Sequence, residues 1–284
     1  MEQKKIHLDS YYTIGNAHNY CQDYAKTFEI LDSSGLTWQI SALSDGCSGA
    51  PDTDIGSRFM VYGLKSWFSL HWLQQQPDEN FNFQKYARYV YEQSQCLFDG
   101  NSLTATLLMA ITNDKSDKVI VHVCGDGALF IARNNGQHEF LTFDYNNLPL
   151  YPIYLKSQRL YDEYVSQHDT KNLIIARYNF SSDFKSYSQM LPESIPFASL
   201  PSAYSLTLDK SDVKSIFLFS DGISSFSQQG NQTNPAEMIT KFLPIKTFQG
   251  EYLVRRSKKF LKEMTKDGCF HQDDFSVAGM IFED

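Results

Sequence analysis

Two periodicities of apolar residues divide the first half of the chain into segments that predict strands and segments that predict helices. Alternating apolar and polar positions, typical of strands with one buried face, occupy residues 11–45 and 103–143. Apolar positions that recur every three or four residues, typical of helices, occupy residues 57–97 with a polar break at 77–80. Turn formers separate the predicted strands at Ser33-Ser34-Gly35, Asn113-Asp114, Gly125-Asp126-Gly127 and Asn134-Asn135-Gly136.

The second half of the chain is less regular. Residues 144–210 are rich in Tyr, Ser and Pro, and only NLIIARY at 172–178 predicts a strand, so we expect an irregular insertion that covers one face. Beyond it, SIFLF at 215–219 predicts a strand and residues 227–235 predict a polar loop. An amphipathic helix through Leu253, Phe260, Leu261 and Met264 and a closing strand at 275–282 follow. We expect a single domain spanning residues 1–284.

Composition and charge limit the class of protein. A content of 42% hydrophobic residues in 284 is enough for a substantial core. The 33 acidic and 25 basic residues give a formal net charge of -8, so we expect no nucleic-acid partner. No apolar run approaches the roughly 20 residues that span a bilayer, and the opening MEQKKIHLDS lacks the apolar core of a signal peptide, so we expect no membrane partner. The five scattered cysteines contain no CxxC pair, which favours a reducing cytoplasm over a disulfide framework.

Aspartates lie where the predicted strands begin or end. They are Asp23 in CQDYA, Asp45 in LSDGC, Asp126 in CGDGA, Asp221 in FSDGI and Asp273-Asp274 in HQDDF. Taken singly, each Asp-Gly pair is a common turn former. If the strands share one sandwich, however, their ends converge, and crowded carboxylates repel one another unless a cation neutralises them. Hard oxygen ligands select magnesium, manganese or calcium.

Two further groups of residues leave alternatives open. His18-x-x-Cys21 and Cys269-x-His271 could supply four zinc ligands if the ends of the chain met, although the second spacing is shorter than usual. Buried thiols and hydrogen-bonded imidazoles are the simpler interpretation. The basic run at 255–259 could dock an acidic partner or could be the solvated face of the last helix.

The order of short motifs along the chain resembles that of the type 2C, PPM-type, metal-dependent serine/threonine phosphatases. The motifs are QDYA, SDGCSG, LTATLLMAI, CGDGALFIA, FSDGISSF and QDDFSVAGM, and the resemblance covers roughly positions 12 to 282. Each motif is short, but their order over nearly the whole chain makes the match specific. The chain is similar to a divergent, bacterial-like member of that family.

The resemblance implies an α+β fold, a four-layer α-β-β-α sandwich in which two antiparallel sheets are flanked by helices. It also implies a centre of two Mg²⁺ or Mn²⁺ ions, with a third more weakly held, and hydrolysis by a water that the metals activate. Carried over to this chain, Asp45 bridges the two ions and contributes to catalysis with Asp221 through that water. The implied metal site comprises Asp23, Asp45, the Gly46 carbonyl, Asp126, Asp221 and Asp273, with Asp126 and Asp221 holding the third ion.

Three residues depart from the family pattern. His18 stands where many members carry a phosphate-binding Arg, and it can contact phosphate well only when protonated. Gln22 replaces a Glu beside the first aspartate and contributes no charge. Cys47 replaces a His that has been proposed as a general acid, and GCSGAPDT offers no Arg for a cysteine-based phosphatase. Phosphate affinity and protonation of the leaving group are the properties that these departures affect.

The functional expectation is a protein phosphatase that hydrolyses phosphoserine and phosphothreonine. Its partners would be phosphoprotein substrates of a serine/threonine kinase, and we expect it to act as a monomer. A pseudophosphatase that binds phosphoproteins without turnover is one alternative, which the missing Arg favours and the retained aspartates disfavour. A metal-dependent hydrolase of small phosphates is the other.

Overall fold

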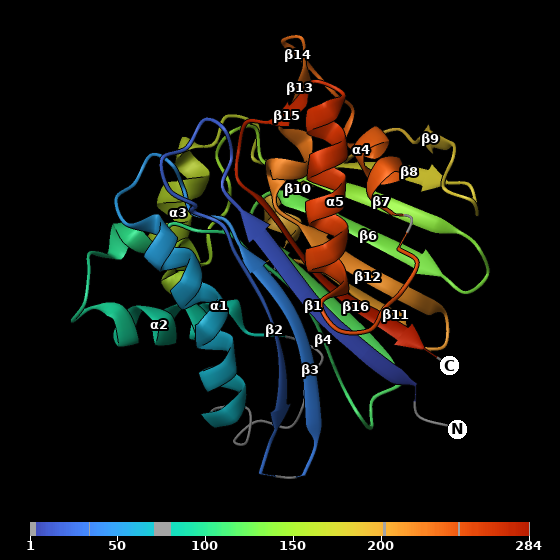
Figure 1. Cartoon of the computed structure of the whole chain (residues 1–284). Helices are drawn as coiled ribbons and strands as arrows, with labels where there is room; N and C mark the ends of the chain where they lie inside the picture. The colour runs from blue at the N-terminus through green and yellow to red at the C-terminus, as the bar shows by residue number, and fades with distance from the viewer. Residues whose placement is uncertain (1–3, 34, 71–80, 201–202, 244, 284) are drawn as a thin grey trace.

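Two antiparallel β-sheets pack face to face in the computed structural model (Figure 1), which describes residues 4–33, 35–70, 81–200, 203–243 and 245–283. The eight-stranded sheet has the order β1-β16-β12-β6-β7-β8-β10, with β9 also paired to β8. Its strands are β1 (Lys5–Thr13), β6 (Gly127–Arg133), β7 (His138–Asp144), β8 (Asn172–Phe180), β9 (Tyr187–Gln189), β10 (Glu193–Pro196), β12 (Val213–Phe219) and β16 (Phe275–Glu283).

The second sheet has five strands in the order β11-β5-β4-β3-β2. They are β2 (Tyr24–Leu31), β3 (Thr37–Ser44), β4 (Leu107–Asn113), β5 (Lys118–Cys124) and β11 (Tyr204–Asp209). A small sheet of β14 (Asn231–Gln232), β13 (Phe226–Gln228) and β15 (Cys269–His271) stands apart from both. Every strand pair in the three sheets is antiparallel.

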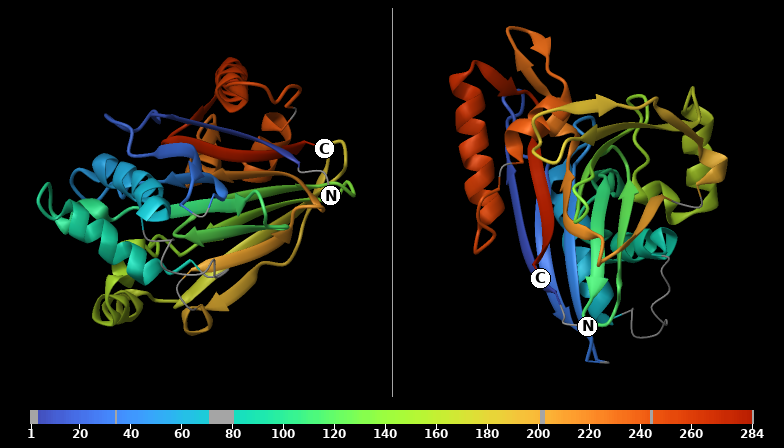
Figure 2. Two further views of the ribbon diagram at one scale, coloured as in Figure 1. Left: turned by 90° about the horizontal axis from the view of Figure 1, so that it is seen from below. Right: turned by 90° about the vertical axis from the view of Figure 1, so that its right-hand side faces the viewer.

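Helices cover the outer faces of the two large sheets (Figure 2). The α-helices in the described residues are α1 (Thr53–Leu70), α2 (Phe83–Ser94), α3 (Gln158–Gln167), α4 (Pro235–Phe242) and α5 (Tyr252–Lys266). The 3-10 helices are η2 (Gly100–Leu103), η3 (Pro152–Lys156), η4 (Phe197–Ser199) and η5 (Asp221–Ser224). Because α1 packs on β2 and β3 while α5 packs on β1 and β16, the layers run helix, sheet, sheet, helix. The expected four-layer α-β-β-α sandwich is therefore confirmed.

Two apolar cores hold these layers together. The inner core fills the space between the sheets and continues under α1 and α2, so the central strand β4 is buried along its whole length. The outer core lies between the eight-stranded sheet and helices α4 and α5, and it is rich in phenylalanine. None of the described helices is both long enough and apolar enough to cross a membrane.

The structure contains more regular elements than the sequence indicated. β1 begins at Lys5, before the expected start at residue 11, and α4 follows the polar loop where no helix was expected. The expectation of an irregular 144–210 segment with one strand is corrected, because this segment contains α3 and strands β8 to β11. The hairpins at 33–35, 113–114 and 134–136 are present, although Ser34 and the expected break at 77–80 lie outside the described residues.

Candidate metal centre

Asp45 and Asp221 follow two strands that end at the same edge of the sandwich. Asp45 comes directly after β3, where its backbone N–H donates to Thr106 Oγ1 at 2.9 Å and its carbonyl accepts from Thr106 N at 2.8 Å. Asp221 begins η5 two residues after β12 ends at Phe219. Each aspartate is thus held by rigid backbone where its strand stops, rather than on a free loop.

Close backbone packing explains the glycine that follows each aspartate. A Cβ atom on Gly46 would lie 2.6 Å from the carbonyl oxygen of Thr53, at the start of α1. A Cβ atom on Gly222 would lie 1.8 Å from the carbonyl oxygen of Asp274. Both distances are shorter than a van der Waals contact, so only glycine allows these turns to pack here. The second contact presses the Asp221 turn against the residues that precede β16.

The carboxylates act on one another electrostatically. Burial raises the pKa of Asp45 well above its usual value, and the negative charges of Asp23, Asp221, Asp126 and Asp273 raise it further, in that order. This pattern requires the five side chains to lie in one region. The structure therefore brings all the aspartates predicted at the strand ends into a single cluster.

Other members of the cluster show the same effect. Burial is also the first cause that raises the pKa of Asp23 and of Asp126, each to about 7. Burial and the charges of Asp126 and Asp273 raise the pKa of Asp221, while contacts with Asp45 and His18 oppose the rise. Asp45, Asp126 and Asp221 keep some solvent access although protein surrounds them densely. The cluster therefore favours either bound protons or a bound cation.

Several carboxylate oxygens of the cluster have no hydrogen-bond partner among the described residues. They are both oxygens of Asp23 and one oxygen each of Asp126 and Asp221. The hydroxyls of Ser220 and Ser276 lie near Asp23 and oppose the rise of its pKa, but neither is aligned as a hydrogen bond. Buried polar atoms without a partner are uncommon in folded proteins. These free lone pairs suit a hard divalent cation.

The side chains are not yet arranged around a common point at coordinating distance. Within the described ranges, no three or more His, Cys, Asp or Glu side chains converge closely enough to hold a metal. The donor set fits Mg²⁺ or Mn²⁺ by its chemistry and charge, and the carboxylates would have to move together on binding.

His18 lies beside this cluster and contacts two aspartates. Its Nε2 is 3.3 Å from Asp273 Oδ1, and its Nδ1 is 3.1 Å from Asp274 Oδ1 without the alignment of a hydrogen bond. Burial alone would lower the pKa of His18, but the carboxylates of Asp274, Asp273 and Asp23 raise it overall. The protonated ring that phosphate contact requires is therefore favoured, although these aspartates already engage the ring.

Asp274 joins two distant segments of the chain, a role that the sequence did not predict. Its side chain is 1% exposed and accepts hydrogen bonds from Gly15 N at 2.7 Å and from Gln22 N at 2.5 Å. It thereby fastens the 15–22 segment, which carries His18 and leads to Asp23, to the start of β16. Gln22 itself donates from Nε2 to Thr53 Oγ1 at 2.6 Å. These long-range bonds could not be found from local patterns.

The 144–210 segment also reaches the cluster. Tyr151, just before η3, lies close to Cys47, and burial, the Cys47 thiol and the charges of Asp126 and Asp45 raise its pKa. Asp144, the last residue of β7, adds a negative charge close to Asp126. Asp144 ends a strand as the predicted aspartates do, so the same sequence signal would have included it.

The zinc alternative fails because its four residues have other neighbours. His18 contacts Asp273 and Asp274, and Cys21 Sγ lies 3.6 Å from the Asp23 carbonyl. Cys269 is buried in the outer core, and His271 Nδ1 lies 2.9 Å from the Asp273 carbonyl. No group of three metal-binding side chains forms in the part of the chain that the structure describes.

The basic run at 255–259 is partly structural. The Arg256 guanidinium donates to the carbonyls of Lys241 and Phe242 at the end of α4, and it fastens α5 to that helix. Arg255 donates to the Gln249 carbonyl, and Lys259 lies 3.7 Å from Glu263 on the solvent side. Most of the run therefore belongs to the surface and packing of α5.

Comparison of the sequence and the fold with known proteins identifies the family that the chain matches. The sequence profile of the family described as protein phosphatase 2C matches residues 16–264. The fold is similar to serine/threonine phosphatase Stp1 from Staphylococcus aureus, with a TM-score of 0.58, 15% identity, and coverage of 100% of this chain and 98% of that one. A serine/threonine phosphatase from S. agalactiae gives 0.53 and 19% identity over 98% and 100% of the two chains.

A third similar structure is the PP2C phosphatase domain of SpoIIE from Bacillus subtilis with a fragment of its regulatory domain. It has a TM-score of 0.55 and 12% identity, over 100% of this chain and 63% of that one. At such identities these structures support the fold alone. A comparison with curated protein sequences gives no match. Because the family profile covers most of the chain, the protein belongs to the protein phosphatase 2C family.

Proposed function

We propose that this protein is a metal-dependent phosphatase that hydrolyses phosphoserine and phosphothreonine in proteins. The observation that carries the proposal is the cluster of Asp45, Asp23, Asp126, Asp221 and Asp273, whose charges raise one another's pKa values while several of their buried oxygens have no hydrogen-bond partner in the described part of the chain. A cluster of this kind is costly to maintain unless a cation neutralises it. The family supports phosphoester hydrolysis as the reaction.

In this proposal, Asp45 and the Gly46 carbonyl hold two divalent ions together with Asp23, Asp221 and Asp273. Mg²⁺ or Mn²⁺ bound there would supply the Lewis acidity that activates water toward phosphorus and neutralises developing negative charge. Asp126 would contribute to a third, looser position, because its charge acts directly on Asp221. Backbone contacts with Thr106 hold Asp45 in place before any ion binds.

Substrate binding in this proposal uses residues at the mouth of the cluster. His18 is the cation nearest to the aspartates, and its raised pKa favours the protonated ring that a phosphoryl oxygen would contact. Gln22 holds the Cys47 carbonyl and Thr53, so it orients the Asp45–Cys47 turn without adding charge. Cys47 lies close to Tyr151 and has no catalytic role in this proposal.

Hydrolysis of a phosphothreonine peptide and of an aryl phosphate, with and without Mn²⁺, tests the proposal. We expect activity only with the metal, and a loss of at least ~100-fold in Asp45→Asn and in Asp221→Asn, because each change weakens the electrostatic centre. Asp169→Asn, a matched change at an exposed position, should leave the rate unchanged. Cys47→Ser should cost far less than either aspartate change.

The same assay separates the alternatives. Tight peptide binding without turnover at any metal concentration would identify a pseudophosphatase. Turnover of the aryl phosphate but not of phosphopeptides would identify a hydrolase of small phosphates. Full activity in excess chelator, or complete loss in Cys47→Ser, would contradict a metal-centred mechanism.

A further inference from the structure

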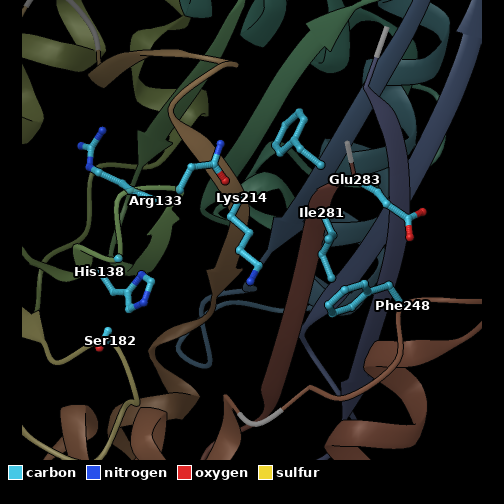
Figure 3. Close-up of a pocket in the computed structure, with 10 residues that line it drawn as sticks. Arg133, His138, Ser182, Lys214, Phe248, Ile281 and Glu283 are labelled. Carbon is cyan, nitrogen blue, oxygen red and sulfur yellow. The ribbon is translucent and has the colours of Figure 1, made fainter. Parts of the chain in front are cut away.

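A cavity of about 380 Å³ lies beside strands β6, β7, β12 and β16 of the eight-stranded sheet (Figure 3). Strand β6 runs from Gly127, beside Asp126, to Arg133 at the cavity, which at about 3.3 Å per residue separates the two sites by roughly 20 Å. The lining comes from the β6–β7 turn, the start of β12, the end of β16 and two loops. It comprises Arg133, Asn134, Gly136, His138, Ser182, Lys214, Phe248, Ile281, Phe282 and Glu283.

The cavity presents an ammonium group that has no partner in the described part of the chain, with a histidine ring beside it. Lys214 has no ion-pair or hydrogen-bond partner among the described residues, and its ammonium group extends into the space between the His138 and Phe248 rings (Figure 3). His138 is 6% exposed, its buried Nδ1 makes no aligned hydrogen bond in the described ranges, and the backbone groups of Ser182 and Gln137 lie near the ring and oppose the lowering of its pKa by burial. Both groups would gain from an acceptor placed between them.

The other charged residues of the lining are already engaged. Arg133 lies 3.5 Å from Glu139, which also pairs with Arg177 at 2.9 Å. Glu283, the one acid among the described lining residues, lies 2.7 Å from His7 Nε2 on the neighbouring strand β1. Burial and the positive charge of Lys214 lower the pKa of His138 overall, although the backbone groups of Ser182 and Gln137 oppose this, so the ring is neutral near pH 7 and Lys214 supplies the positive charge of the cavity.

A β-bulge directs Lys214 into this cavity. In the pairing of β12 with β6, Val213 lies opposite Arg133 and Ser215 opposite Ala132, so Lys214 is the extra residue. Ile216 and Leu218 point into the inner core, and strict alternation would send residue 214 there as well. The bulge places Val213 in the inner core instead and leaves Lys214 on the outer face. The bulge thereby keeps the charge of Lys214 out of the inner core and places its ammonium group at the cavity.

The wall of the cavity is also fixed in position. The Asn134 backbone N–H donates to the Asp212 carbonyl at 2.8 Å, and its side chain donates to the Ser211 carbonyl at 2.6 Å. These bonds fasten the β6–β7 turn to the segment that leads into β12. His138 and Lys214 are therefore held on two connected elements.

A smaller cavity of about 130 Å³ adjoins the first and is lined mainly by aromatic and aliphatic side chains. His138, Lys214 and Phe248 line both cavities. The His138 ring stacks on Phe184 with centroids 4.4 Å apart. A cavity of about 150 Å³ lined by apolar side chains can hold one benzene ring. The inner space therefore suits a single ring, with the Lys214 ammonium group and the His138 ring at its entrance. Its lining includes Phe130, Phe184, Phe217, Leu243, Ile245 and Phe248.

We propose that these joined cavities bind a small anion that carries one aromatic ring, with the ring among the phenylalanines and the carboxylate or phosphoryl group between Lys214 and His138. The site is separate from the aspartate cluster and does not depend on the proposed function. It unites an apolar pocket with a few convergent donors, as small-molecule sites commonly do.

Calorimetric titration of the whole protein in excess chelator tests this site, with phenylphosphonate and benzoate as probes. The chelator and the use of a phosphonate exclude metal binding and hydrolysis. We expect saturable binding of at least one probe, and weaker or no binding of inorganic phosphate and of benzyl alcohol, which carry only one half of the recognised chemistry. Equal binding of inorganic phosphate would overturn the role of the aromatic pocket.

Substitutions of two lining residues test whether the probes bind in the cavity. Lys214→Met should weaken binding about tenfold, whereas Lys259→Met, the same change on the exposed face of α5, should have no effect. His138→Phe should weaken binding while keeping the contact with Phe184. If the melting temperature shows that His138→Phe is misfolded, the comparison of Lys214→Met with wild type still tests the site, because Lys214 is exposed. Absence of binding by both aromatic anions up to about 10 mM, or equal affinity of Lys214→Met and wild type, would refute the proposal.

Discussion

Gly222 stands at the tightest backbone contact of the aspartate cluster. Because a Cβ atom here would meet the Asp274 carbonyl oxygen at 1.8 Å and the Phe275 Cα at 3.1 Å, the chain before β16 would have to shift. We expect Gly222→Ala to lower the free energy of unfolding by about 2–3 kcal/mol, as overpacking does in other cores. Urea unfolding measures this change.

Gly49→Ala is the matched control for this substitution. A Cβ atom on Gly49 would meet Cys47 Sγ at 3.7 Å, an ordinary contact, so the free energy of unfolding should change little. Equal stability of Gly222→Ala and wild type would mean that the Asp221 turn does not pack against residues 274–275 as described.

His122 gives a pH dependence that is separate from the aspartates. The side chain is buried against Phe81 and Phe83, its Nδ1 lies 2.8 Å from Ser205 Oγ, and burial lowers its pKa to about 4. Between pH 6.5 and about 4, the unfolded chain binds a proton that the folded protein does not. The stability that neutral His122 contributes is therefore present above pH 6.5 and is lost as the pH falls, by up to about 1.4 kcal/mol per pH unit.

Comparison of wild type with His122→Gln isolates this effect. The difference in their free energies of unfolding should shrink steadily from pH 7 to pH 4, as measured by urea titrations. A difference that stays constant over this range would show that His122 binds its proton over the same pH range in the folded protein as in the unfolded chain.

At the scale of single residues, the sequence identified the aspartates but not what surrounds them. The positions of Asp45, Asp126 and Asp221 follow from strand ends and glycines, which are local features. The contacts of His18 with Asp274 and of Tyr151 with Cys47 join residues far apart in the chain, so no local pattern contains them. The role of the clustered aspartates as metal ligands stays a prediction.

At the scale of elements, α5 begins with a cap from a distant strand. Its N-cap residue Glu251 makes no side-chain cap bond, whereas Asp9 Oδ2 in β1 accepts from Leu253 N at 2.5 Å and from Val254 N at 3.3 Å. The carboxylate satisfies two free N–H groups at the positive end of the helix. We expect Asp9→Ala to lower the free energy of unfolding by about 1–2 kcal/mol in urea titrations.

Glu251→Ala is the corresponding control at the same helix end. Glu251 makes no cap bond, and its charge raises the pKa of Asp9, so its removal should leave stability unchanged or slightly increased. If Glu251→Ala lowers the free energy of unfolding as much as Asp9→Ala does, Asp9 is not the residue that caps α5.

The helices and strands that the sequence did not predict also depend on contacts between distant parts of the chain. An aspartate in the middle of KIHLDSYYT weakens the strand pattern, and its partners on α5 explain why it is tolerated in β1. α3 has only one buried side chain, Tyr164, and so shows little apolar periodicity. α4 is short, although Asn234 at its cap and Pro235 at its first position are recognisable start signals. The long apolar strands β4, β5, β6 and β12 were predictable because burial dominates their composition.

At the scale of the whole molecule, the sandwich concentrates negative charge at one end of its sheets. Since the raised pKa values of Asp23 and Asp126 are about 7 and their usual value is 3.8, the folded protein without metal keeps protons that the unfolded chain has released. This contribution to stability is complete below pH 4 and is lost as the pH rises through about 7. A divalent cation would replace those protons, so its stabilising effect should grow over the same range.

Thermal unfolding with and without manganese tests this linkage. At a hundred times its dissociation constant, a cation that binds only the folded state stabilises it by about 2.7 kcal/mol. For a domain of this size we expect the melting temperature to rise by about 5–10 °C at pH 8 and by less at pH 6. The contribution of His122 cancels, because it is present with and without metal.

Asp45→Asn is the decisive variant in this experiment. Without metal it should melt above wild type, because one of the repelling charges is gone, and it should respond little to manganese. Asp169→Asn, at an exposed position, should behave as wild type in both respects. If Asp45→Asn and wild type gain equally from manganese, the ion binds elsewhere; if neither gains, the aspartates hold protons rather than a metal, and the proposed centre is wrong.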